Sequence, residues 1–330
     1  MNSTALERLR SWPRTPLAAL PTRMVQASHL AATLGAAPDQ IQVKMDAETG
    51  FALGGNKVRK LEFELAPERL SRATHLITTG GPQSNHCRVT AAAAAHLGLR
   101  CILVVNGEAP GDPRGNALLH RLFGAEIRTV ASREERAPAM EAAAAEISRS
   151  GGRPLIVPLG ASTPDGTLGY ALAAAESMEQ LETLRSVGRT WMFVSASSCG
   201  TLAGLLLGIS LLGRRDVALV GVSADISADD MRAETLRLAR GGAALLDWDG
   251  RLTDFTLECD DTQIGGGYGV VTPAAREAID LFGRTHGIVL DPVYTGKAAA
   301  GLVAWVRRGE IPPGDRVVFV HTGGHPALLV

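Results

Sequence analysis

Short apolar segments alternate with longer helix-forming segments along this chain, and this alternation restricts the possible folds more than any other feature. The expected strands are residues 74–81, 101–107, 125–130, 154–160, 191–197, 217–224 and 316–324, and the expected helices are residues 84–99, 115–123, 134–149 and 201–213. Strands separated by helices form mostly parallel sheets with helices on both faces. The sequence therefore predicts an α/β protein, in which the polar, glycine-rich residues 240–261 form an irregular connection.

Length and charge narrow the class further. A chain of 330 residues exceeds what one hydrophobic core supports, roughly 250 to 300 residues, so two domains are expected. The 33 basic and 34 acidic residues nearly cancel, which favours a small-molecule partner over nucleic acid or a membrane surface. The longest apolar stretch, residues 202–213, is shorter than the roughly 20 residues that span a bilayer. It is expected to be a buried helix.

The N-terminal segment and the cysteines indicate a cytoplasmic protein. Glu7, Arg8, Arg10 and Arg14 interrupt the apolar residues that a signal peptide would need. The four cysteines are far apart in sequence and form no CxxC pair: Cys87, Cys101, Cys199 and Cys259. We therefore expect reduced thiols, with neither a disulfide framework nor a zinc site.

A lysine follows a glycine turn at the start of an expected helix, in the sequence GGNKVRKLEF at residues 54–63. Gly54 and Gly55 permit a positive φ and close approach by another group, so the turn can present the amine of Lys57. A solvated lysine on an ordinary glycine turn has the same local pattern, so this motif alone does not define a site.

Two further loops lie where expected strands end, which is where ligands bind in open parallel sheets. Residues 78–86 run from a strand through two glycines to Ser84 and Asn85 at a helix start, an arrangement that suits a carboxylate. Residues 195–205 pass through small residues into another helix start, which is typical of a phosphate cup. A plain helix cap and a packing turn remain the structural alternatives. Neither a Walker loop nor GxGxxG is present, which argues against a nucleotide.

The C-terminal third places two of the chain's three tyrosines in glycine- or proline-flanked loops. Tyr268 and Tyr294 there suggest aromatic surface for a flat ligand, although either could instead brace its loop. His321 and His325 are four residues apart, but the intervening glycines remove helical ligand spacing, so no metal is inferred. A lysine, a phosphate cup, an anion site and tyrosines together fit pyridoxal phosphate, whose aldehyde forms a Schiff base with lysine.

Six motifs in this chain resemble those of the D-cysteine desulfhydrase and 1-aminocyclopropane-1-carboxylate deaminase family. They are GGNKVRKLEF, QSNHCRVTAAAAAHLG, GTLAGL, GYGVVTPAAREAI, GIVLDPVYTGKAAAGL and HTGGHPAL, and the resemblance extends from about residue 13 to the C-terminus. It implies a two-domain, fold-type II pyridoxal phosphate enzyme that forms a homodimer. Residues 1–59 and 169–330 would form the large cofactor-binding domain, and residues 60–168 the small α/β domain.

The resemblance also assigns roles to individual residues. It makes Lys57 the Schiff-base lysine and, with Ser84 and Tyr294, a catalytic residue. The implied cofactor contacts are Lys57, Lys60, Asn85, Ser198, Cys199, Gly200, Thr201, Leu202, Tyr268, Thr295 and Thr322. The implied contacts of an amino-acid substrate are Gln83, Ser84, Asn85, His86, Tyr268 and Tyr294.

Two positions divide the activities within the family. Ring-opening deaminases resemble DPVYEGK and HLGG, whereas this chain has Thr295 and Thr322 where those have glutamate and leucine, as β-eliminating members do. A carboxylate beside the pyridine nitrogen keeps it protonated and a hydroxyl does not, so we expect α,β-elimination that yields pyruvate and ammonia. D-Cysteine-like substrates are the main expectation, L-cysteate is an alternative, and the cyclopropane amino acid is less favoured.

Some stretches depart from the family pattern. The family's KRDD is VKMDAETG here, Pro82 precedes QSNH, the cup reads SSCGTLAG, and LPTRMVQASHL replaces a common Pro-Thr-Pro-Leu. These changes leave the β-substituent and the enantiomer open. A non-catalytic protein that retains pyridoxal phosphate and a dinucleotide binder are the alternatives from other classes.

Overall fold

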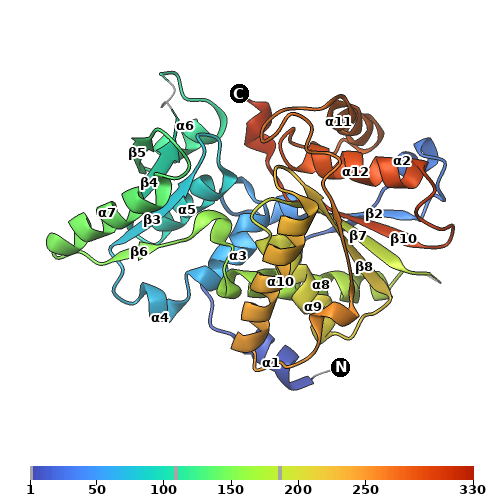
Figure 1. The fold of residues 1–330 in the computed structure, drawn as a ribbon, viewed down its shortest axis with the longest axis horizontal. Helices are drawn as coiled ribbons and strands as arrows, with labels where there is room; N and C mark the ends of the chain where they lie inside the picture. Colours follow the sequence, from blue (N-terminus) through green and yellow to red (C-terminus); the bar gives the residue numbers. More distant parts are fainter. Residues whose placement is uncertain (1–2, 108–110, 185–187) are drawn as a thin grey trace.

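The computed structural model describes residues 3–107, 111–184 and 188–330, and they build two sheets with helices on both faces (Figure 1). The larger sheet has the strand order β1-β2-β10-β7-β8-β9 and the smaller one β5-β4-β3-β6. All neighbouring strands are parallel except β1 and β2. The predicted α/β class with mostly parallel sheets is confirmed.

The larger sheet is built from strands at both ends of the chain. Its strands are β1 (Met24–Gln26), β2 (Ile41–Lys44), β7 (Thr190–Ala196), β8 (Val217–Ser223), β9 (Thr256–Asp260) and β10 (Arg316–Val320). One face packs against α8 (Pro164–Glu182), α9 (Gly200–Leu211) and α10 (Ala228–Leu245). The other packs against α2 (Ser28–Thr33), α11 (Pro273–His286) and α12 (Thr295–Arg307). Side chains alternate between the two cores, with Met192 and Val194 on one face and Phe193 on the other.

The smaller sheet lies to one side in Figure 1, with its strands consecutive in the middle of the sequence. They are β3 (His75–Gly80), β4 (Arg100–Asn106), β5 (Glu126–Val130) and β6 (Pro154–Ile156). Around them lie α3 (Asn56–Glu64), α4 (Pro67–Leu70), α5 (Asn85–His96), α6 (Gly115–Leu122) and α7 (Arg136–Arg149), and α1 (Ser3–Ser11) lies near α8. The domain limits expected from the sequence stay a prediction, since the sheets do not define where one domain ends.

The expected elements occur where the alternation places them, with one wrong prediction and several omissions, among them β1 and β2. Residues 240–261 are not an irregular connection: α10 continues to Leu245, and β9 pairs with β8 in parallel. β9 is the edge strand and has only Leu257 and Asp260 buried, so its sequence lacks an apolar run. The long helix α8 was also absent from the expected set. Among the described residues, no helix is long and apolar enough to cross a bilayer.

The apolar segment expected to be a buried helix is α9, and all of its residues are buried. It packs against α8 at glycines: a Cβ on Gly204 would lie 2.4 Å from the Thr167 carbonyl oxygen, and one on Gly208 2.5 Å from that of Ala171. This close packing fixes the first turn of α9 relative to the carboxyl end of β7.

Candidate active site

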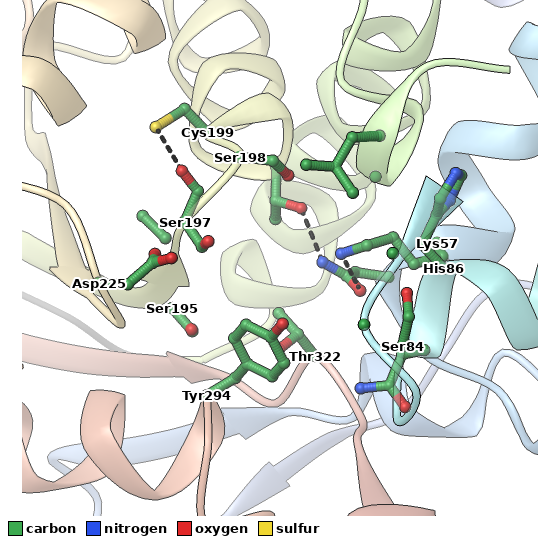
Figure 2. A pocket seen from close by; sticks show the side chains of 18 of the residues that line it. Lys57, Ser84, His86, Ser195, Ser197, Ser198, Cys199, Asp225, Tyr294 and Thr322 are labelled. Carbon is green, nitrogen blue, oxygen red and sulfur yellow. Dashed lines mark hydrogen bonds between the residues drawn. The ribbon is translucent and has the colours of Figure 1, made fainter. Parts of the chain in front are cut away.

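Steric constraints place Lys57 in the first turn of α3 (Figure 2). Gly54 and Gly55 have φ values of 65° and 107°. A Cβ on Gly54 would lie 2.0 Å from the Ala47 carbonyl oxygen, and one on Gly55 3.0 Å from that of Thr322. Only glycine fits these positions, so the turn is closed against the segment that follows β10, and Lys57, two residues after Gly55, lines a cavity.

The Lys57 amine has few polar partners. Its one hydrogen bond in the described structure is to the Asn56 Oδ1, at 3.2 Å. Burial, and then the charge of Arg88, lower the pKa of Lys57 to about 8, against an opposing effect of Asp291. About one tenth of a lysine with this pKa is neutral at pH 7, far more than of an ordinary lysine, and the neutral amine is the nucleophilic form.

The start of α5 faces the same cavity. Ser84 caps the helix, since its Oγ accepts a hydrogen bond from the Cys87 amide at 3.2 Å. The Asn85 Oδ1 accepts hydrogen bonds from Asn116 at 2.9 Å and from Arg88 at 3.3 Å. Because both partners are donors, the amide nitrogen of Asn85 is available to donate to a ligand.

Arg88 connects α5 to the lysine turn. It is buried, and besides Asn85 it donates to the Gly54 carbonyl at 2.7 Å. His86 is fixed differently: its Nε2 lies 2.7 Å from the Thr78 Oγ1, and burial holds its pKa well below the ordinary value. His86 therefore enters the site as a neutral ring.

The start of α9 forms the third part of the site. Cys199 is left-handed with φ 56°, which turns the chain from β7 into the helix. The Ser162 hydroxyl donates to the Ser198 Oγ at 2.8 Å and accepts from the Lys60 Nζ at 2.9 Å. Burial raises the pKa of the Cys199 thiol to about 12, so it is a neutral thiol here. The helix start offers an N-terminal dipole end to an anion.

The two tyrosines predicted to contact a ligand lie together. Their hydroxyl oxygens are 2.5 Å apart and the rings meet edge to face, with centroids 5.9 Å apart. The Asp291 carboxylate holds the loop of Tyr294 by accepting from the amides of Val293, Tyr294 and Thr295, each at 2.9 Å.

The structure brings most of the predicted site residues to one cavity of about 900 Å³, its open mouth included. Its lining includes Lys57, Ser84, Asn85, His86, Ser198, Cys199, Thr201, Tyr268, Tyr294 and Thr322. Figure 2 shows Lys57 and Ser84 on one side of the cavity and Ser197 and Asp225 on the other.

Five predicted residues do not line the cavity: Lys60, Gln83, Gly200, Leu202 and Thr295. Lys60 lies behind Ser162, and burial holds its pKa well below the ordinary value. The Gln83 side chain instead bonds to Arg114 and Asn116.

The other three have structural surroundings. The Gly200 amide bonds to the Ser198 carbonyl at 2.7 Å, and Leu202 packs in the apolar core. The Thr295 hydroxyl donates to the Asp291 Oδ1 at 2.7 Å and is fully buried. Thr295 was expected beside the cofactor, but in this structure its hydroxyl is engaged one layer behind the lining.

Sequence reasoning missed the lining residues Arg133, Arg136 and Asp225 altogether. It gave no individual role to Asn56, Ser195 and Ser197, although they lie within the predicted lysine turn and phosphate cup. Arg133 and Arg136 follow β5, and Asp225 follows β8. The rule that ligands bind beyond the carboxyl ends of strands applies to both loops, so strand order would have been the signal.

Fold and site together define an enzyme that uses pyridoxal phosphate. The cavity offers an amine of lowered pKa, a helix start for a phosphate, an amide donor and two aromatic rings, which is the donor set that this cofactor needs. A sequence model of the family described as pyridoxal-phosphate dependent enzyme matches residues 16–323, and the chain belongs to that family.

Within that family the chain is similar to two kinds of enzyme. A protein named 1-aminocyclopropane-1-carboxylate deaminase from Burkholderia vietnamiensis is 37% identical over 97% of this chain and 96% of its own. A D-cysteine desulfhydrase from Salmonella typhi is 35% identical over 98% of each chain. A solved structure described as an ACC deaminase homologue superimposes with a TM-score of 0.87, at 35% identity over 100% of this chain and 97% of that one. The predicted family and fold type are confirmed.

Proposed function

We propose that this enzyme catalyses α,β-elimination on a β-substituted amino acid, as a D-cysteine desulfhydrase does, giving pyruvate, ammonia and the leaving group. One observation carries the proposal. The Lys57 amine lies in the same cavity as the starts of α5 and α9. The lysine therefore faces two anion sites, one for a substrate carboxylate at α5 and one for a cofactor phosphate at α9.

The residues present account for each part of pyridoxal phosphate. Lys57 would attach the aldehyde, and the Asn85 amide would donate to the phenolic oxygen. Ser198, Cys199 and Thr201 at the start of α9 would hold the phosphate, and Thr322 would lie near the pyridine nitrogen. When bound, this cofactor stabilises negative charge at the substrate Cα.

The chain's own residues orient the substrate and move its proton. Ser84 and the start of α5 would bind the α-carboxylate, which places the Cα hydrogen within reach of the Lys57 amine. Lys57 accepts that proton as the general base. The Cα–H electron pair forms the Cα=Cβ bond, and the β-substituent leaves with the Cβ bond pair. Water then converts the released enamine to pyruvate and ammonia.

Thr322 favours elimination over ring opening. It contributes a hydroxyl to the lining, and Asp225 is the one carboxylate among the described lining residues. Thr295 stands where ring-opening relatives have a carboxylate, and its own hydroxyl is bound to Asp291. A pyridine nitrogen beside a hydroxyl stays largely unprotonated, which supplies the weaker electron sink that expulsion of a good leaving group requires.

The test combines labelling with a substrate panel. Borohydride reduction of the yellow holoenzyme should fix the cofactor on the peptide that contains Lys57, and Lys57→Ala should abolish that label. D- and L-cysteine, cysteate, β-chloroalanine and the cyclopropane amino acid are then assayed for pyruvate, 2-oxobutyrate, sulfide and sulfite. Pyruvate from a β-substituted alanine supports the proposal. Strong 2-oxobutyrate formation without any pyruvate would contradict it.

We further propose that the enzyme is a cytoplasmic homodimer, as the family resemblance implies. The near-zero net charge of −1 supports this proposal only in that it gives the chain no strong attraction to a membrane surface or to nucleic acid. Light scattering of the purified holoenzyme should give twice the chain mass of 34.6 kDa. A monomer mass would refute the dimer.

A further inference from the structure

Two arginines in the cavity have no task in the proposed reaction. Arg133 and Arg136 both line it, at the turn into α7 and at the first residue of that helix. The phosphate is assigned to the start of α9, and the α-carboxylate to the start of α5. A third cationic region therefore faces the same cavity.

Arg136 is held in place but not neutralised. One end of its guanidinium donates to the Asn106 Oδ1 at the end of β4, while its Nε is buried without a hydrogen-bond partner in the described structure. Its pKa is lowered by burial and then by the charge of Arg133. Two like charges thus stand close together, and Arg136 has no ion pair among the described residues.

The charge of Arg133, unlike that of Arg136, is partly balanced by a nearby carboxylate. Its guanidinium lies 5.0 Å from the centroid of the Tyr268 ring and 3.7 Å from an oxygen of Asp225. Asp225 thus balances one of the two arginines, and its other oxygen is buried without a partner. Arg133, Arg136 and Asp225 together form one wall of the cavity. With two cations and one anion, the net charge of this wall is positive.

This wall lies beside the residues expected at the reacting carbon. Tyr268 lies under Arg133 and shares a hydrogen bond with Tyr294, and both tyrosines line the same cavity as Arg136. A group extending from the substrate Cβ past the tyrosines would meet the two guanidiniums.

We propose that Arg136, together with Arg133, binds a negative charge on the β-substituent, so that the physiological substrate is an amino acid whose leaving group is anionic. A thioether bearing a carboxylate is one such substrate, and a sulfonate is another. This inference rests on the proposed elimination. A charge-assisted hydrogen bond to a guanidinium corresponds to about a tenfold to hundredfold preference for the anion.

Three cysteine thioethers of similar size separate the possibilities: S-carboxymethyl, S-ethyl and S-(2-aminoethyl) cysteine, each as both enantiomers. In every case the C–S bond breaks, sulfur leaves with the electron pair, and the products are pyruvate, ammonia and a thiol. The holoenzyme should show a kcat/KM for the carboxymethyl substrate at least about tenfold above that for the ethyl one. A preference for the aminoethyl substrate would show that the Asp225 carboxylate, and not the two arginines, selects the charge of the β-substituent, and it would overturn the proposal.

Variants identify the residue responsible. Arg136→Gln should reduce the carboxymethyl-to-ethyl ratio to near one, mainly through KM, and Arg136→Lys should restore part of it. Arg149→Gln, an exposed arginine at the other end of α7, is the matched control and should keep the wild-type ratio. An equal loss on all three substrates would instead place Arg136 on the α-carboxylate and refute the inference.

Equilibrium binding supplies a readout that does not depend on turnover. Calorimetry on the holoenzyme should show succinate binding more tightly than butyrate, and Arg136→Gln should remove the difference. Equal affinities in the wild type would contradict the proposal. Pyruvate from S-ethyl cysteine without any charge preference would reject this inference alone, whereas no pyruvate and no label on Lys57 would reject the proposed function.

Discussion

The buried charge cluster under α3 provides the sharpest test of how the site is held. Arg59, two residues after Lys57, donates to Asp46 and to Glu176, each at 2.9 Å. Asp46 also accepts from Thr22 at 2.7 Å and from Tyr170 at 2.6 Å. With Lys44 included, the cluster contains two cations and two anions, and it fixes the face of α3 opposite the cavity.

We predict that Asp46→Asn destabilises the protein by about 3 to 5 kcal/mol, the usual effect of removing one partner of a buried ion pair. Burial opposes ionisation of Asp46, but Arg59 and the hydrogen bonds outweigh it, and the pKa of Asp46 lies below its ordinary value. The substitution would leave the cluster with one positive charge in excess, next to the Arg59 side chain, which is only 1% exposed. With an unfolding entropy of roughly 0.7 kcal/mol/K for 330 residues, Tm should fall by about 4 to 7 °C.

The neighbouring surface pair is the control. Arg23 and Glu48 lie next to the same segments, but their side chains are 67% and 38% exposed. Glu48→Gln should therefore cost less than about 1 kcal/mol and shift Tm by roughly 1 °C or less. Calorimetric unfolding of the holoenzyme measures both. If Asp46→Asn moved Tm no more than Glu48→Gln does, the buried cluster would not stabilise α3 as argued.

Three further outcomes follow from the site and its supports. Ser84→Ala removes the hydrogen bond that the Cys87 amide donates to the Ser84 Oγ, which is worth about 1 kcal/mol, so Tm should fall by only about 1 to 2 °C. The kcat/KM should fall far more, while the yellow colour of the cofactor remains. Unchanged kinetics would show that Ser84 does not belong to the site. Cofactor reloading of the apoenzyme should accelerate with pH, reach half its maximum near pH 8 and level off about one pH unit above that, because the neutral Lys57 amine reacts and its pKa is about 8. A rate still rising at pH 10 would contradict that pKa. Gly169→Ala would bring a Cβ to 2.2 Å from the Arg59 carbonyl oxygen and should lower the free energy of unfolding by about 1 to 3 kcal/mol. Gly283→Ala is the control: open space surrounds this helical glycine, so the substitution should leave Tm unchanged or raise it in the same thermal assay.

Much of the fold follows from local sequence signals. The apolar segments became strands of parallel sheets, and Ser84 caps α5 as its position before the helix predicts. β9 was missed because an edge strand needs few buried side chains and therefore has no apolar run, and β1 and β2 were not predicted either. The two glycines before Lys57 predict a turn that presents its amine, since backbone sterics at a turn depend on a few adjacent residues, but its role in the site came from the family resemblance.

Other features depended on contacts between distant segments. Thr295 looked like a cofactor contact in the linear motif, but packing turned its hydroxyl toward Asp291. Arg133, Arg136 and Asp225 gave no local signal, and they meet only because the order of strands in the two sheets brings the ends of β5 and β8 to one cavity. The sequence by itself determined the strand and helix pattern, the lysine turn and the family, because these depend on neighbouring residues. The tertiary structure alone decided which side chains face the substrate, because that depends on how the segments pack.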